Sequence, residues 1–170
     1  MEVQRCVVEQ CAGFGLHLGS GSQRPRVSDC RAIKNDKDGF CFCWRVCGGV
    51  AEGNWLEGNG GYGMSIGHKD SDNLVRLNTV IGNAKGFVHW RSETEPMATH
   101  RITFEKNTVR DNEGWLFVDG MTHGTVIRNN TIEDTGAGRQ RTGIRIGGKT
   151  EKILIEGNRI IAVERIQDER

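Results

Sequence analysis

Side chains that can move protons or balance charge gather after three short apolar segments. They are, in chain order, His68, Lys69, Asp70, Asp72, His89, Arg91, Glu93, Asp119 and His123. A histidine suits the role of a base near neutral pH, and a nearby arginine or lysine stabilises the charge that develops when a proton is removed. Carboxylates are the ligands that Ca²⁺ prefers, so Asp70 and Asp72 are candidate metal ligands. Exposed turns carry such residues in any protein, and the prediction therefore depends on the fold bringing them together.

The chain is built from a repeat, which is clearest between Val75 and Asn83. The asparagine at position 78 belongs to a column with steps of 24, 24, 24, 29, 23 and 28 residues. This column is Cys6, Cys30, Asn54, Asn78, Asn107, Asn130 and Asn158. A second polar column, five residues later, is Cys11, Asn35, Asn59, Asn83, Asn112 and Thr135. Apolar columns flank the first column on both sides, and a third apolar segment follows a glycine in the first four repeats.

Apolar residues alternate within each segment, which is the period of a β-strand. Each repeat therefore provides about three short strands, and repeats that cannot bury their apolar face alone must stack. We predict an all-β solenoid, a parallel β-helix of about seven coils with a period of about 24 residues. Adjacent coils would lie about 4.8 Å apart, and the asparagines would form hydrogen-bonded ladders at the corners.

The pattern resembles the right-handed parallel β-helix repeat of the pectin lyase-like superfamily. The stretch from Gly63 to Asn73 is similar to a segment common in bacterial β-helix repeat proteins. The resemblance covers residues 1–166, which we interpret as a single domain followed by a charged tail at 167–170. Because related enzymes are usually longer, we expect either a fragment of a longer β-helix or a short rod whose open end is covered by another subunit. Copies assembling end to end would satisfy the second case.

The resemblance implies a carbohydrate-active protein, since the superfamily includes polysaccharide lyases, epimerases and glycoside hydrolases. A lyase or epimerase needs a base for the proton beside a uronate carboxyl and a cation for the resulting charge. A hydrolase instead needs two carboxyls, about 5 Å apart for retention or about 6.5–9.5 Å apart for inversion. The alternative is a non-catalytic β-helix that binds glycan or serves a structural role. The resemblance also favours an extracellular or periplasmic location, although residues 1–6 belong to the first repeat and do not resemble a signal peptide.

The predicted site is a groove beside one sheet in which an extracellular polysaccharide is bound or processed. The residues assigned to catalysis are His68, Asp70, His89, Arg91, Glu93 and Asp119. Tyr62, Lys69 and His123 are assigned to glycan binding, with Ca²⁺ at Asp70 and Asp72 as the one cofactor considered. The repeat lengthens at 92–100 and again at 136–141, and longer turns of a solenoid commonly build its binding face. We therefore expect these two insertions to flank one groove.

Charge and hydropathy argue against two other classes of partner. The chain has 23 Lys and Arg against 22 Asp and Glu, a net charge of +1, which gives no electrostatic case for nucleic acid or an anionic membrane surface. No apolar run approaches the ~20 residues of a membrane-spanning helix.

Cysteines and aromatic residues leave several alternatives open. Cys6 and Cys30 occupy one column on adjacent coils, which would allow a disulfide, although we favour stacked free thiols. Cys41, Cys43 and Cys47 form a single group, whereas a zinc site usually draws cysteines from two places, so zinc is not predicted. The aromatic residues whose register allows exposure are Trp44, Tyr62 and Phe87, while the stretch 115–118 alternates acceptably in either phase.

Overall fold

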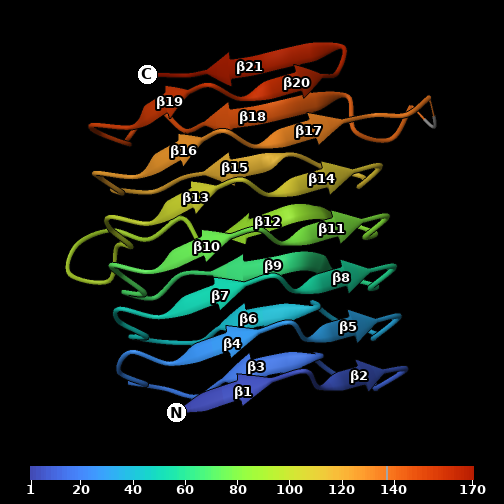
Figure 1. The fold of residues 1–170 in the computed structure, drawn as a ribbon. Helices are drawn as coiled ribbons and strands as arrows, with labels where there is room; N and C mark the ends of the chain where they lie inside the picture. Colours follow the sequence, from blue (N-terminus) through green and yellow to red (C-terminus); the bar gives the residue numbers. More distant parts are fainter. Residues whose placement is uncertain (137) are drawn as a thin grey trace.

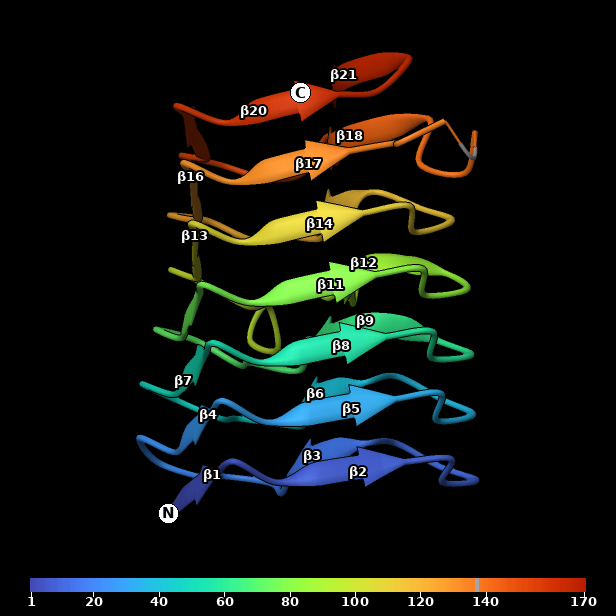
Figure 2. The same ribbon diagram turned by 45° about the vertical axis from the view of Figure 1, so that its right-hand side comes forward.

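A computed structural model describes residues 1–136 and 138–170 of the chain. Within these residues, 21 strands form three seven-stranded parallel sheets that wind around one core, so that each coil contributes one strand to every sheet (Figures 1 and 2). The prediction of an all-β parallel solenoid of about seven coils is confirmed. Among the described residues there is no helix with the length and apolarity needed to cross a membrane.

The three sheets, named A, B and C in chain order, consist of short strands. Sheet A contains β1 (Glu2–Gln4), β4 (Arg26–Ser28), β7 (Val50–Glu52), β10 (Leu74–Arg76), β13 (Thr103–Glu105), β16 (Val126–Arg128) and β19 (Leu154–Glu156). Sheet B contains β2 (Val7–Glu9), β5 (Arg31–Ile33), β8 (Trp55–Glu57), β11 (Thr79–Ile81), β14 (Thr108–Arg110), β17 (Thr131–Glu133) and β20 (Arg159–Ile161). Sheet C contains β3 (Leu16–Leu18), β6 (Phe40–Phe42), β9 (Tyr62–Ile66), β12 (Gly86–Trp90), β15 (Leu116–Val118), β18 (Thr142–Ile146) and β21 (Glu164–Asp168). The last strand pairs with β18 as far as Asp168, two residues beyond the predicted end of the domain.

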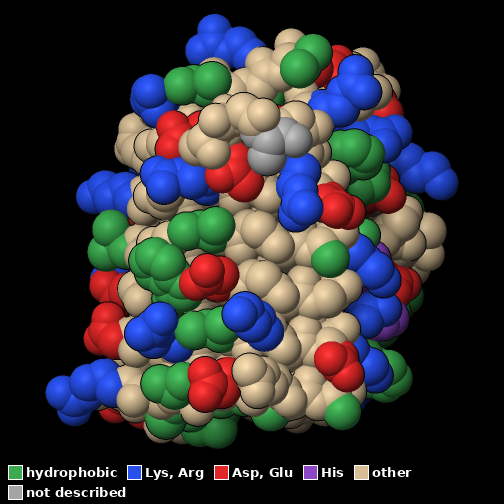
Figure 3. All heavy atoms as spheres, turned by 90° about the vertical axis from the view of Figure 1, so that its right-hand side faces the viewer, with side chains coloured by type: hydrophobic (Ala, Val, Ile, Leu, Met, Phe, Trp, Pro, Cys, Tyr) green, Lys and Arg blue, Asp and Glu red, His purple; other side chains and the backbone are tan. Residues whose placement is uncertain are grey.

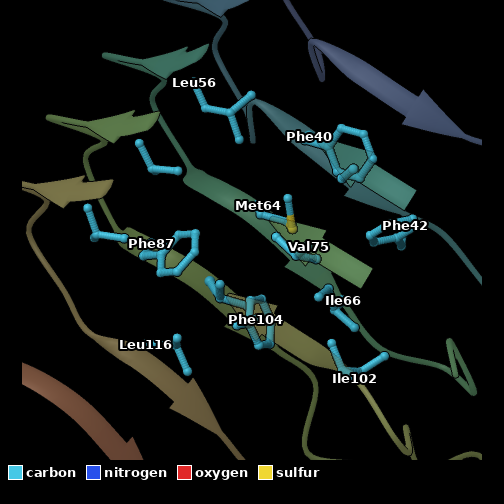
Figure 4. Close-up of a cluster of buried hydrophobic side chains, with 14 of the residues drawn as sticks. Phe40, Phe42, Leu56, Met64, Ile66, Val75, Phe87, Ile102, Phe104 and Leu116 are labelled. Atoms are coloured by element: carbon cyan, nitrogen blue, oxygen red, sulfur yellow. The ribbon is translucent and has the colours of Figure 1, made fainter. Parts of the chain in front are cut away.

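The apolar columns of the sequence are columns of the core. Val75 pairs with Ala51 on the coil before it and with Phe104 on the coil after it. Figure 4 shows large side chains from the three sheets meeting inside the solenoid, among them Phe87 and Phe104, whose ring centroids are 5.9 Å apart. Phe87 has no exposed surface, so the prediction that its register allows exposure is wrong. Phe87 and the next residue, Val88, are both buried, so the alternation of β12 breaks at this point and the Phe87 ring packs against Phe104 in the core.

Asparagine ladders run along two corners of the rod, as the repeat predicts. The side-chain Nδ2 of Asn54 donates to Oδ1 of Asn78, and Nδ2 of Asn78 donates to Oδ1 of Asn107, both at 3.0 Å. The second ladder departs from prediction after Asn112, because its backbone N–H donates to Gln140 and not to Thr135. The exposed Thr135 instead hydrogen-bonds Asp111, and it is Gln140, after the insertion, that occupies the corner.

The two insertions lie at opposite edges of sheet C. Residues 91–102 connect β12 to β13, and residues 134–141 connect β17 to β18, so one follows a sheet C strand and the other precedes one. Figure 1 shows the corresponding loops on the left and right of the rod. Figure 3 shows the side formed by the turns between sheets B and C, where Lys and Arg side chains are mixed with Asp and Glu. Sheet C is therefore the sheet that longer turns border on both edges.

Replacing Gly63 with alanine is expected to destabilise the rod by about 1–3 kcal/mol, the usual cost of overpacking a core. A Cβ on Gly63 would lie 2.2 Å from Cγ1 of Val80 and 3.1 Å from the carbonyl oxygen of Phe87. Gly13→Ala is the matched control, because a Cβ there meets nothing within 4 Å. Chemical denaturation of both variants measures the difference, and equal stabilities would contradict the packing described for Gly63.

Candidate functional site

A groove of about 480 Å³ lies on the outer face of sheet C. Tyr62 on β9, His89 on β12, Phe117 on β15 and Asp119 just beyond β15 line it. Strand alternation explains why these side chains face outward, because the residues on either side of His89 and Phe117 are buried. The structure therefore brings together three of the predicted site residues, Tyr62, His89 and Asp119.

The groove continues along the rod toward the N-terminal coils. A second hollow of about 400 Å³ shares Tyr62, Lys85 and His89 with the first and extends to Phe14 and Asp38. Because each coil adds about 4.8 Å along the axis, the two hollows together follow several coils. An elongated depression of this kind fits a chain-like ligand better than a compact one.

His89 and Tyr62 form a stacked pair within the groove. Their ring centroids are 4.8 Å apart and their planes differ by 29°. Burial lowers the pKa of His89, and the charges of Arg91 and Lys85 lower it further, against the opposing effect of Asp38. Burial also raises the pKa of Tyr62. Both side chains therefore hold their neutral forms at neutral pH, the histidine as a proton acceptor and the tyrosine as a proton donor.

Two cations border this pair. Lys85 is exposed and lines both hollows beside His89. The aliphatic part of the Arg91 side chain lies over Gly67, where an added Cβ would come within 2.5 Å of it. Arg91 leaves the end of β12 two residues after His89 and is half-buried. A carboxylate that entered the groove near His89 would thus meet positive charge.

Aromatic side chains form the floor of the groove on the side of the later coils. Trp115 and Phe117 are both partly exposed, which settles the phase of this stretch because Leu116 and Val118 are buried. The Arg145 guanidinium lies 5.4 Å from the Trp115 ring and 4.9 Å from the Phe117 ring. These cation–π contacts hold the two rings in place next to His89.

A second group of predicted residues lies on the turns between sheets C and A. Nδ1 of His68 is 2.7 Å from Oε1 of Glu93, and the His68 ring packs against Trp44. Lys69 and Asp72 line a separate hollow of about 410 Å³, where Asp72 pairs with Arg101 at 2.6 Å. This hollow has no lining residue in common with the groove over sheet C.

His123 lies farther along the same turns, in a stack with His100 whose ring centroids are 3.9 Å apart. Nε2 of His100 is 2.9 Å from Oε1 of Glu95. Burial lowers the pKa of His100, and His123 adds to this effect, whereas Glu95 opposes it. The backbone N–H of His123 donates to Nδ1 of His100 and so joins the two turns. His123 does not line the groove over sheet C.

Asp70 is placed inside the solenoid wall, with no exposed surface. One of its carboxylate oxygens accepts the N–H of Val46 at 2.8 Å, and the other accepts the N–H of Gly67 at 2.9 Å. Burial raises its pKa to about 7, although those N–H donors and Arg91 act in the opposite direction. Asp70 thus fixes the turn after β9 and does not reach the groove. Calcium binding at Asp70 and Asp72 remains a prediction that this placement does not favour.

Five solvent-accessible residues of the groove were not predicted from the sequence: Lys85, Ser92, Glu113, Trp115 and Phe117. The alternation at 115–118 carried a signal for the two aromatic residues, but it fitted both phases equally. Lys85 lies in a turn after an asparagine and belongs to none of the columns of the repeat. The repeat therefore does not distinguish it from other exposed lysines.

The family model described as "Right handed beta helix region" matches residues 1–99, more than half of the chain. The chain belongs to the right-handed β-helix family. Among solved structures, the A-module of mannuronan C-5 epimerase AlgE4 from Azotobacter vinelandii aligns with this β-helix protein at a TM-score of 0.54 and 16% identity. The alignment covers 98% of this chain and 61% of that module, so the β-helix spans less than two thirds of the module's length. At this identity the likeness establishes the fold alone. No curated protein matches the sequence.

Proposed function

We propose that the β-helix is a carbohydrate-active protein that binds a uronate-containing polysaccharide along sheet C and acts on it by proton transfer. The observation that carries this proposal is the His89–Tyr62 stack, a neutral base beside a neutral acid in one groove. His89 would remove the proton next to the uronate carboxyl, and Tyr62 would return a proton to the sugar or to the leaving oxygen. Lys85 and Arg91 would stabilise the negative charge on the carboxyl.

The shape of the site supports a polymeric substrate. The two hollows that share His89 follow the rod axis, and Trp115 and Phe117 provide apolar ring faces on which sugar rings can stack. The aligned AlgE4 module is described as a mannuronan C-5 epimerase, and this likeness supports a polysaccharide as the partner of the β-helix. We favour a lyase or an epimerase over a hydrolase because the stacked pair in the groove is an imidazole and a phenol. The carboxyls of Glu113 and Asp119 line the same groove.

Trp115→Ala is expected to weaken glycan binding about tenfold or more, since one aromatic face contributes about 1.5 kcal/mol through stacking. The binding assay uses a panel of uronate-containing and neutral polysaccharides, with ultraviolet absorbance and nuclear magnetic resonance following unsaturated and epimerised products. Trp55→Ala is the matched control, because Trp55 is exposed on sheet B and outside the groove.

Binding of acidic polysaccharides that Trp115→Ala weakens and Trp55→Ala leaves intact would support the groove. Binding without any product would support the non-catalytic alternative, and would remove the acid–base roles of Tyr62 and His89. Preference for neutral polysaccharides would contradict the roles of Lys85 and Arg91. No binding to any member of the panel would contradict the whole proposal.

A further inference from the structure

Three metal-ligating side chains meet on sheet C near the N-terminal end of the rod. His17 on β3 pairs in register with Cys41 on β6. Cys43 lies two residues after Cys41, so strand alternation points both thiols to the outer side of the sheet. The histidine and the cysteines are 24 or more residues apart in sequence, and the stacking of the first two coils brings them together.

The ligand atoms of these three side chains are close enough to share one ion. The nearest imidazole nitrogen of His17 and the Sγ atoms of Cys41 and Cys43 all lie within 4.8 Å of one another. In tetrahedral zinc sites, bonds of about 2.0–2.3 Å place neighbouring ligand atoms about 3.3–3.8 Å apart. Small side-chain rotations would bring the three ligand atoms from their present separation to the separation found in zinc sites. Across residues 1–136 and 138–170, no other three His, Cys, Asp or Glu side chains come this close.

We propose that His17, Cys41 and Cys43 form a binding site for Zn²⁺. Two thiolates and one imidazole are the donors that select zinc over calcium or magnesium, and three protein ligands leave a fourth position open. Binding forms two Zn–S bonds and one Zn–N bond and releases the two thiol protons to solvent. The sequence argued against zinc because the cysteines form a single group along the chain. In the structure, the stacking of the coils adds a ligand from another part of the sequence, His17.

The surroundings of the site favour a cation. Cys41 is 4% exposed and forms the floor, whereas His17 is exposed and gives an ion access from solvent. The Asp38 carboxylate is close enough to act on the Cys41 thiol, so a bound cation would have negative charge nearby. The Phe14 ring lies 5.3 Å from the His17 ring and limits its movement.

The site is separate from the His89–Tyr62 pair. Cys41 pairs with Ser65, and Ser65 pairs with His89, so the cysteine and the histidine occupy one column two coils apart. That separation corresponds to about 10 Å. The zinc proposal therefore does not depend on the proposed proton transfer, and it can be tested without any glycan.

Cobalt titration of the purified full chain tests the proposal. The metal-free protein is kept reduced with a phosphine, because a thiol reductant would itself bind the metal. We expect a thiolate-to-Co²⁺ charge-transfer band that saturates at one ion per chain and disappears when Zn²⁺ displaces the cobalt. Cys43→Ser and His17→Gln are each expected to weaken Co²⁺ binding at least tenfold. Both side chains have exposed surface, so these variants keep the fold, and thermal unfolding verifies this.

Cys47→Ser is the matched control. It removes a partly exposed thiol from the same coil, four residues after Cys43, whose Sγ lies 3.7 Å from an Asp72 oxygen outside the cluster. Unchanged cobalt binding by Cys47→Ser, together with its loss in Cys43→Ser, would support the site. A missing charge-transfer band, or a band that survives Cys43→Ser or is lost in Cys47→Ser, would overturn it.

Discussion

His89→Gln is expected to lower the turnover number on the acidic polysaccharide by about 10²–10⁴-fold, the usual contribution of a positioned general base. Glutamine retains the size and polarity of the half-buried histidine but cannot accept and hold a proton. Because the substitution leaves Trp115, Phe117 and both cations in place, the dissociation constant for the polysaccharide is expected to change much less than the turnover number. Steady-state kinetics and direct binding measurements on the same preparation separate the two effects.

Tyr62→Phe tests the partner of His89 in the same assay. If the two side chains act as an acid–base pair, the double variant should be no slower than the slower single variant, because residues that work as a unit are not additive. Lys149→Ala, an exposed charge change on the turn after β18, serves as the control for preparation and general charge effects. Turnover that survives in His89→Gln would remove this residue from the mechanism.

The pH dependence gives a further readout of the same prediction. The pKa of His89 is lowered mainly by burial, so its neutral form persists below the ordinary titration range of histidine. Activity is therefore expected to remain constant from pH 7 down through that range and to fall only at lower pH, where His89 becomes protonated. An acid limb that lies at or above the ordinary histidine pKa would show that another group controls the reaction.

The fold could be predicted because each coil repeats the same physical requirement. The column that contains Val75 is apolar in every coil since each member covers the one before it, and the pairs of Val75 with Ala51 and Phe104 match the sequence register. Only the coils with insertions depart from the predicted register. Gln140 replaces Thr135 in the second ladder because a side chain after the insertion can return to the corner, which no fixed period reveals.

The site could be predicted only in part because turns lack the alternation that strands have. His89 and Tyr62 lie on strands, and their outward direction follows from their buried neighbours. Asp70 lies on a turn, where the sequence does not show whether a carboxylate points to solvent or accepts backbone N–H groups inside. The contact of His17 with Cys41 and Cys43 was hidden for another reason, since it exists only between coils.

Asn78→Ala is expected to destabilise the protein by about 3–5 kcal/mol, because it removes a buried side chain that satisfies groups on both neighbouring coils. Oδ1 of Asn78 accepts from the backbone N–H and from Nδ2 of Asn54, at 2.9 and 3.0 Å. Its Nδ2 donates to the carbonyl of Ala51 and to Asn107, both at 3.0 Å. Alanine would leave two donors and one carbonyl buried without partners, each at a cost of about 1–3 kcal/mol.

Asn158→Ala is the matched control, because Asn158 occupies the same ladder column in the last coil and is only partly buried. It makes the same kinds of bond, to the N–H and Nδ2 of Asn130 and to the carbonyl of Ile127. Water can reach the groups that this substitution frees, so we expect less than half the loss caused by Asn78→Ala. For a chain of this size the central variant should lower the midpoint of thermal unfolding by about 10 °C. Equal losses at the two positions would show that hydrogen bonds within the ladder, and not the burial of the groups they satisfy, determine the stability of the coil corner.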